Sequence, residues 1–277
     1  MNIFEKMIYG LQGTMPEPGN YGWFHLMFVA IVIVGTVLMC HFCRNCSDKT
    51  FRLIALIAWI VMVVLEIYKQ LVFSFNYENG KAYWDYQWYA FPYQLCSTPL
   101  YVLPFIAFSK RGGGNLRDAC TAYMSTFSLF GGLVVFFYPN DVFIPIIGIN
   151  IQTMIHHGLQ IVLGIFFLVY NRKKLNFKYF LKGVIVFLIT FTVALLMNLI
   201  FHTFVNETFN MFYISPYYEC TLPLLSLVYA NVPYVVFLLI YFIGFILAAL
   251  VIYLIQWGII LGVNKIKANR TKAAANE

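Results

Sequence analysis

Long, nearly uninterrupted apolar segments are the feature of this sequence that most restricts its fold. Seven of them can be drawn, at roughly 22–42, 53–75, 91–108, 119–138, 143–170, 179–202 and 232–262. Each is long enough to cross a hydrocarbon core of ~30 Å as a helix. Membrane-spanning strands would instead show segments of about ten residues in which apolar and polar side chains alternate. We therefore predict an all-α polytopic membrane protein, a bundle of seven transmembrane helices.

The overall composition excludes a water-soluble enzyme. Hydrophobic residues make up 61% of the 277-residue chain and charged residues only 10%, which is too few polar side chains to cover a soluble surface. The net charge of +7 would suggest a nucleic-acid partner in a soluble protein. In a membrane protein the position of the charges decides their meaning, and here they follow the loops, so we expect no nucleic-acid partner.

The basic residues predict the orientation of the chain. Fifteen of the 18 lie in one set of alternate connections, at 44–52, 110–117, 172–182 and 265–272, whereas the opposite set holds only Lys6, Lys69 and Lys81. Because cytoplasmic loops carry the excess of Lys and Arg, we expect the N-terminus outside and the C-terminus in the cytoplasm. This predicts an outer N-terminal segment at 1–21, a single transmembrane domain at 22–262 and a basic cytoplasmic tail at 263–277, in the plasma membrane.

Three cysteines end the first span. Cys40, Cys43 and Cys46 have spacings that would allow a metal site, but an iron–sulfur cluster would want a fourth cysteine where Thr50 stands. Cysteines beside a cytoplasmic helix end are commonly reduced thiols or lipidation sites. We assign no metal and no cofactor.

Polar side chains inside the apolar segments converge at one depth. Counted at about 1.5 Å per residue, they fall in the outer half of their spans. They are His25, Glu66, Gln94, Cys96, His157, Asn198 and His202. Polar side chains at the depth of the hydrocarbon core need polar partners or a water-filled cavity. We therefore expect one cavity in the outer half of the bundle. For Glu66, an interhelical hydrogen bond is an equally good interpretation.

Two further segments carry structural expectations. The outer loop from Thr203 to Asn231 contains Asn210 among large apolar residues, and its 29 residues are too many for a simple connection. We expect it to fold back over the mouth of the bundle. Ser125, Ser128, Gly131 and Gly132 form a stripe of small residues that predicts close approach of neighbouring helices.

Cys96 lies in the most unusual apolar segment, between prolines and beside Gln94, Ser97 and Thr98. A thiol becomes a nucleophile when a nearby base takes its proton, and a histidine is the usual partner. Cys96 with His157, or with His156 as the other candidate, supplies the elements of acyl transfer through a thioester. Gln94, Asn198 or Ser97 are candidate donors to the oxyanion. Against this, cysteine is common in apolar spans as a simple packing residue.

The order of these features resembles the YwaF-type family of bacterial integral membrane proteins over nearly the whole chain. The matching elements are Trp23 to His25, Glu66, Pro92 to Cys96, the pair His157-Gly158, and Asn198 followed by Asn210-Met211-Phe212. That family is similar to an animal multi-pass family that remodels ether phospholipids by acyl transfer through a Cys and a His. The resemblance implies Cys96 as nucleophile and His157 as base, and it departs at Gln94, where the bacterial relatives carry a histidine.

The predicted function is a membrane-embedded lipid acyltransferase or acyl hydrolase with a phospholipid or other acyl lipid as substrate. Cys96 and His157 would be catalytic, and His25 or Glu66 would orient or tune the base. Gln94, His156, Asn198 and Asn210 are the remaining candidate site residues. The alternatives are a non-enzymatic small-molecule binding protein or transporter and an assembly subunit.

Overall fold

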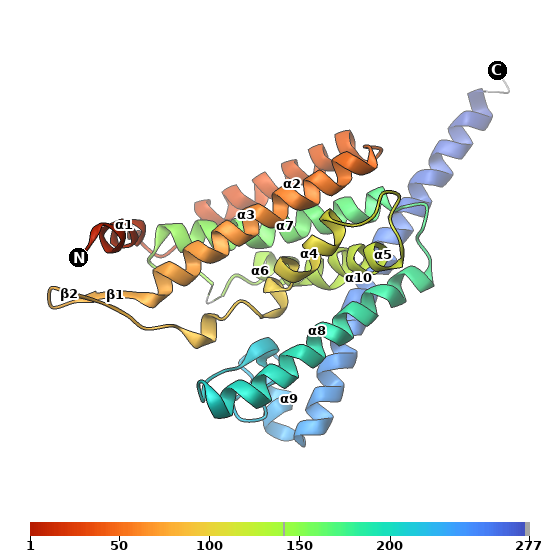
Figure 1. Cartoon of the computed structure of the whole chain (residues 1–277). Coiled ribbons are helices and arrows are strands. Elements are labelled where there is room, and N and C mark those ends of the chain that lie inside the picture. Colours follow the sequence, from red (N-terminus) through yellow and green to blue (C-terminus); the bar gives the residue numbers. More distant parts are fainter. Residues whose placement is uncertain (141, 275–277) are drawn as a thin grey trace.

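The computed structural model describes residues 1–140 and 142–274, and helices dominate it (Figure 1). The helices are α1 (Ile3–Leu11), α2 (Trp23–Cys43), α3 (Asp48–Ser74), α4 (Pro99–Ala107), α5 (Asn115–Tyr123), α6 (Leu129–Phe137), α7 (Ile147–Tyr170), α8 (Phe177–Phe204), α9 (Leu225–Asn231) and α10 (Tyr234–Ala274). One hairpin of β1 (Phe75–Glu78) and β2 (Lys81–Trp84) follows α3. The expected class, an all-α polytopic membrane protein, is confirmed.

Six helices in the described residues are long and apolar enough to cross a membrane. They begin at Trp23, Asp48, Asn115, Ile147, Phe177 and Tyr234, which matches six of the seven expected spans. The third expected span, 91–108, is different. Its apolar helical part runs only from Leu95 to Ala107, about 20 Å at 1.5 Å per residue, and an irregular chain leads into it. A regular seventh spanning helix was therefore the wrong prediction for this segment.

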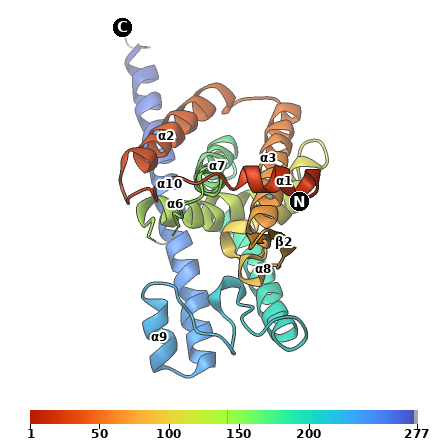
Figure 2. The same ribbon diagram turned by 90° about the vertical axis from the view of Figure 1, so that its left-hand side faces the viewer.

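Helix α7 occupies the middle of the bundle (Figures 1 and 2). It packs against α2 and α3 on one side and against α6 on another. Helix α8 and the lower part of α10 extend below this group in the turned view, where α9 lies beside α10 on the side away from α8 (Figure 2). The segment between α8 and α9 carries Phe209, Met211, Phe212 and Ile214 into the main hydrophobic core. The long loop thus folds back onto the bundle, as expected.

The α5–α6 segment is one helix with a π-helical turn from Met124 to Ser128. Gln256 of α10 donates a hydrogen bond to the carbonyl oxygen of Ser125 inside that turn, at 3.0 Å. A π turn interrupts the regular hydrogen bonds of an α-helix. A side-chain donor to one of its carbonyl oxygens therefore stabilises the turn. The contact also joins α10 to the rest of the bundle.

Glycines on α6 bring it close to α7, as the stripe of small residues predicted. A Cβ atom added to Gly132 would lie 2.7 Å from the carbonyl oxygen of His157, and one added to Gly131 would lie 3.4 Å from Gln160 Oε1. No side chain fits the first position without a shift of the backbone. The small residues therefore set the separation of these helices.

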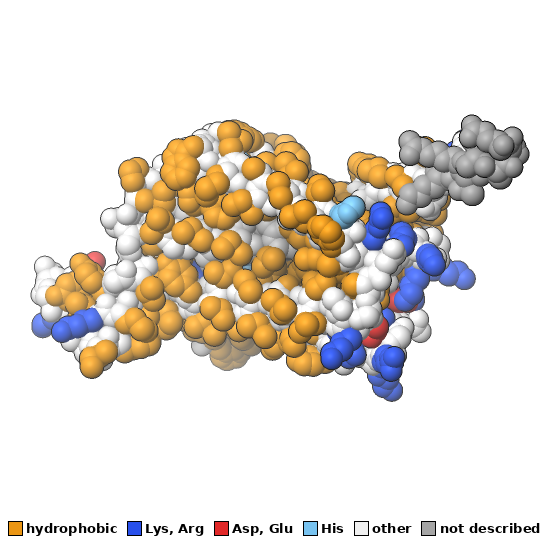
Figure 3. Space-filling view, turned by 90° about the horizontal axis from the view of Figure 1, so that it is seen from above, with side chains coloured by type: hydrophobic (Ala, Val, Ile, Leu, Met, Phe, Trp, Pro, Cys, Tyr) orange, Lys and Arg blue, Asp and Glu red, His pale blue; other side chains and the backbone are white. Residues whose placement is uncertain are grey.

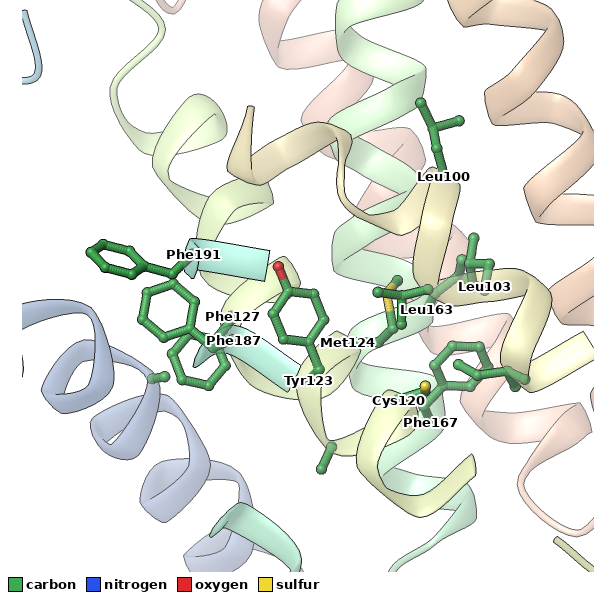
Figure 4. Packing of buried hydrophobic residues seen from close by; sticks show 14 of the residues in the cluster. Leu100, Leu103, Cys120, Tyr123, Met124, Phe127, Leu163, Phe167, Phe187 and Phe191 are labelled. Carbon is green, nitrogen blue, oxygen red and sulfur yellow. The ribbon is translucent and has the colours of Figure 1, made fainter. Parts of the chain in front are cut away.

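Aromatic side chains fill the core between α5, α7 and α8 (Figure 4). Tyr123 stacks on Phe127, which in turn stacks on Phe187 with ring centroids 4.4 Å apart. Outside this core, large apolar side chains are spread over the face that Figure 3 shows. Exposed apolar residues of four different helices include Ile31, Ile57, Ile189 and Leu239. An apolar exterior of this extent suits a lipid environment and not water.

Basic residues gather at the end of the bundle where α2 meets α3 and α7 meets α8, here called the basic end (Figure 3). Arg172 donates to the carbonyl oxygen of Arg44 at 2.9 Å, and Arg117 pairs with Asp48. Three of the basic connections expected on one side therefore meet in space. The tail expected at 263–277 continues α10 as far as Ala274, and its last three residues lie outside the described part.

Candidate functional site

Cys96 sits in a single 3₁₀ turn, Leu95–Ser97, immediately before α4. Pro99 is the first residue of that helix. Because proline has no N–H to donate to a preceding turn, the backbone before it does not have to be α-helical. Thr98 anchors the turn, because its hydroxyl lies 2.7 Å from the carbonyl oxygen of Leu95 and 2.6 Å from the Tyr123 hydroxyl. The thiol thus belongs to irregular backbone inside a helical membrane protein.

Two side chains of α7 bind the backbone of Cys96. His156 Nε2 and Gln160 Nε2 both donate to its carbonyl oxygen, each at 2.9 Å. They are four residues apart, so they lie on one face of the helix. Non-helical backbone at membrane depth persists only where its polar groups are satisfied by protein or water. The buried pair His156 and Gln160 meets that requirement for Cys96.

This contact places Cys96 level with the middle of α7, whose 24 residues run from Ile147 to Tyr170. The depth is greater than the outer-half position expected from a helix beginning at Phe91. Residues 91–94 are not helical, and irregular chain advances further per residue than the 1.5 Å of a helix. The extended entry therefore carries the thiol deeper into the bundle.

The neighbouring His157 has the opposite proton arrangement. Its Nδ1 lies 2.8 Å from the carbonyl oxygen of Thr153, and a ring nitrogen bonded to a carbonyl must carry the proton. In the neutral ring the lone pair of His157 is therefore on Nε2, whereas the lone pair of His156 is on Nδ1. The two rings lie 5.5 Å apart between centroids. Adjacent histidines thus present different nitrogens as bases.

Glu66 lies in a charged cluster on α3. Lys69 Nζ is 2.9 Å from Glu66 Oε1, and Gln70 donates to the same oxygen at 2.6 Å. Gln70 also donates to the carbonyl oxygen of Ala90, which ties α3 to the chain that leads to Cys96. These bonds connect the Glu66–Lys69 ion pair to the chain that enters the Cys96 turn.

Three predicted site residues hold the long loop. Asn198 binds both the N–H and the carbonyl oxygen of Met211, and Gln94 accepts from the N–H of Phe212. Asn210 donates to the carbonyl oxygen of Glu219. Phe212 has φ near +57°, a conformation that bulky residues rarely adopt, so these amides hold strained backbone.

A cavity of about 270 Å³ opens beside these amides. It is lined by Tyr89, Gln94, Thr208, Asn210, Tyr213, Tyr218 and Thr221. Each lining side chain carries a hydroxyl, phenol or amide group, and none is charged. The cavity thus lies between the chain that enters the Cys96 turn and the long loop between α8 and α9.

His25 belongs to another part of the structure. Its Nδ1 accepts from the N–H of Tyr21 at 3.2 Å, and its ring packs against Phe136 and Phe143. It makes no hydrogen bond to the described Glu66, Cys96, His156 or His157. The structure thus joins Cys96 to His156, with His157 as the next residue of α7, and leaves His25 against Phe136 and Phe143 of a separate apolar cluster.

Comparison with known proteins decides the family. The sequence profile of the TMEM164 family matches residues 20–255, most of the chain. The chain belongs to the TMEM164 family. No curated protein and no solved structure matches it. The matched region of this TMEM164 family member begins just before α2 and ends within α10, so it includes every residue of the candidate site.

Sequence reasoning missed Lys69, Gln70 and Gln160 as members of the site. Spacing alone carried the signal, because Lys69 and Gln70 follow Glu66 by three and four residues and Gln160 follows His156 by four. In the described part of this TMEM164 family chain, no three His, Cys, Asp or Glu side chains form a metal-binding group, and all six cysteines are free.

Proposed function

We propose that this protein is a thiol-dependent lipid acyltransferase or acyl hydrolase, with Cys96 as nucleophile and His157 as base. The main observation behind the proposal is that the two adjacent histidines make different hydrogen bonds. His156 holds the backbone of Cys96, and His157 keeps Nε2 free of protein partners among the described residues. An imidazole held through Nδ1–H with Nε2 available is the arrangement that a general base requires.

The proposed reaction has two steps. Cys96 Sγ attacks the ester carbonyl of an acyl lipid while its proton passes to His157 Nε2. The S–C bond forms, the ester C–O bond breaks, and the leaving alcohol takes the proton from His157. A second alcohol, or water, then attacks the thioester and regenerates the thiol. An alcohol makes the protein a transferase, and water makes it a hydrolase.

The surroundings of Cys96 favour a lipid substrate over a soluble one. The thiol lies level with the middle of a membrane-spanning helix, where acyl chains are the abundant ligand. The cavity lined by Gln94 and Asn210 offers polar, uncharged partners for the glycerol or ester region of a phospholipid. The likeness to YwaF-type proteins and to the ether-phospholipid acyltransferases agrees with this substrate class.

The proposal includes the plasma membrane as the location, with the N-terminus outside. The basic end would then face the cytoplasm, and the cavity beside Asn210 would face outward. The positions of the Lys and Arg residues support this orientation.

A thioester trap tests the activity. The purified protein is reconstituted with a phospholipid whose acyl chain carries an alkyne, and covalent adducts are detected before and after neutral hydroxylamine. We expect a hydroxylamine-sensitive adduct that disappears in Cys96→Ala. Cys40→Ala is the matched control, since Cys40 is also partly buried. Equal labelling of Cys96→Ala and the unsubstituted protein, or binding of the lipid with no adduct in either, contradicts the proposal.

A further inference from the structure

A second cavity, of about 430 Å³, lies at the basic end, beside the C-terminal end of α7. It is lined by Arg44, Asn45, Cys46, Asp48, Gly112, Arg117, Tyr170, Asn171, Arg172, Lys173 and Lys174. The lining comes from three separate connections, α2–α3, α4–α5 and α7–α8. Tyr170 stacks on Phe51 with ring centroids 4.0 Å apart, which gives the cavity a rigid aromatic wall.

The charge of this cavity is strongly unbalanced. Five of its lining side chains are cationic and one, Asp48, is anionic. Asp48 is already shared by Arg52 and by Arg117, which is 5% exposed. Lys174 pairs with Asp118, whereas Arg44 and Lys173 make no ion pair with any described carboxylate. A concave surface with one sign of charge focuses its field and concentrates counter-ions.

Orientation in the membrane explains why basic residues lie at this end, but not why they surround one hollow. Like charges repel, and solvated loops would keep them apart. Here Arg172 is instead fixed in place, because it donates to the carbonyl oxygen of Arg44 and to the side chain of Asn45. Arg44 carries a second guanidinium, which has no ion pair with a described carboxylate, and guanidinium groups match the geometry of phosphate oxygens.

We infer that this cavity binds a phosphate group, carried either by an anionic lipid headgroup or by a soluble phosphorylated compound. Arg44 and Lys173 supply the free cations, and Arg172 joins the two connections that carry them. The position at the end of the spanning helices is the level at which lipid phosphates lie. The inference is independent of acyl transfer at Cys96, since it concerns the C-terminal end of α7, whereas Cys96 lies level with the middle of that helix.

Binding to the full-length protein in detergent tests it. The probes are short-chain phosphatidylglycerol, inorganic pyrophosphate, and short-chain phosphatidylcholine as the zwitterionic control. The variant R44Q/K173Q removes two lining cations. The matched control K49Q/K178Q removes two exposed cations of the same end that do not line the cavity. We expect R44Q/K173Q to weaken binding of the anionic probes at least tenfold and the control variant to weaken it less than threefold.

Each outcome has one meaning. Equal weakening in the two variants, binding of phosphatidylcholine as tight as that of the anionic probes, or no anion binding to the unsubstituted protein overturns the inference. Preference for phosphatidylglycerol over pyrophosphate identifies the source as a lipid headgroup, and comparable affinity identifies a soluble phosphate. Unchanged melting temperatures without ligand show that both variants are folded.

Discussion

His156 Nε2 donates a hydrogen bond to the carbonyl oxygen of Cys96, at 2.9 Å. The bond joins a helix in the middle of the bundle to the one irregular turn that carries the candidate nucleophile. It makes His156 a positioning residue in the proposed mechanism, in which His157 is the base.

Replacing His156 tests the positioning role. His156→Leu removes one of two donors to a buried carbonyl oxygen, so we expect a loss of about 1–3 kcal/mol in unfolding free energy. We also expect faster hydrogen exchange in the Cys96 turn. His156→Gln is the control, because its amide nitrogen reaches about as far as Nε2 and retains the bond. Equal exchange rates in the two variants would show that the bond does not hold the turn.

Replacing His157 separates chemistry from stability. His157→Gln keeps a polar side chain on α7 and removes the base, so we expect the rate of Cys96 acylation to fall about 10²–10⁴-fold. The melting temperature should stay close to that of the unsubstituted protein, because the only bond lost runs to Thr153 of the same helix. An unchanged acylation rate would exclude His157 as the base.

The close approach of α6 and α7 is testable through a glycine. Gly132→Ala would place a Cβ atom 2.7 Å from the backbone oxygen of His157, and we expect destabilisation by about 1–3 kcal/mol. Gly244→Ala in α10 meets nothing within 4 Å and should be neutral or stabilising by up to about 1 kcal/mol. Thermal unfolding in detergent compares the two. Similar melting temperatures would mean that the helices separate at little cost.

The long loop depends on Asn198. Asn198→Leu leaves the N–H and the carbonyl oxygen of Met211 without their partner, at a cost of about 1–3 kcal/mol for each buried group. We expect proteolysis within 205–224 to accelerate at least tenfold. Asn231→Ala is the control, since that side chain is exposed and bonds only within its own helix. Equal digestion of both variants would contradict the anchoring role.

Much of the fold followed from the apolar pattern. Six spans, the fold-back of the long loop and the close contact of Gly132 with α7 were predictable, because each depends on hydrophobic length or residue size alone. The short helix at 99–107 was not predictable from this pattern. An apolar sequence has the same composition whether it crosses as a helix or enters as irregular chain, and only side chains from elsewhere satisfy the second form.

The same distinction applies to the site. By itself the sequence determined that polar residues lie inside a membrane bundle, since hydropathy marks the spans. It did not determine the depth of Cys96, because residues 91–94 are not helical. Which residues touch depended on helix rotation and on long-range hydrogen bonds. Only the tertiary structure decided that His156 and Gln160 hold Cys96, that His157 faces a different partner, and that His25 lies apart. Neighbouring residues on a helix point about 100° apart, so one position along α7 separates the residue that holds Cys96 from the proposed base.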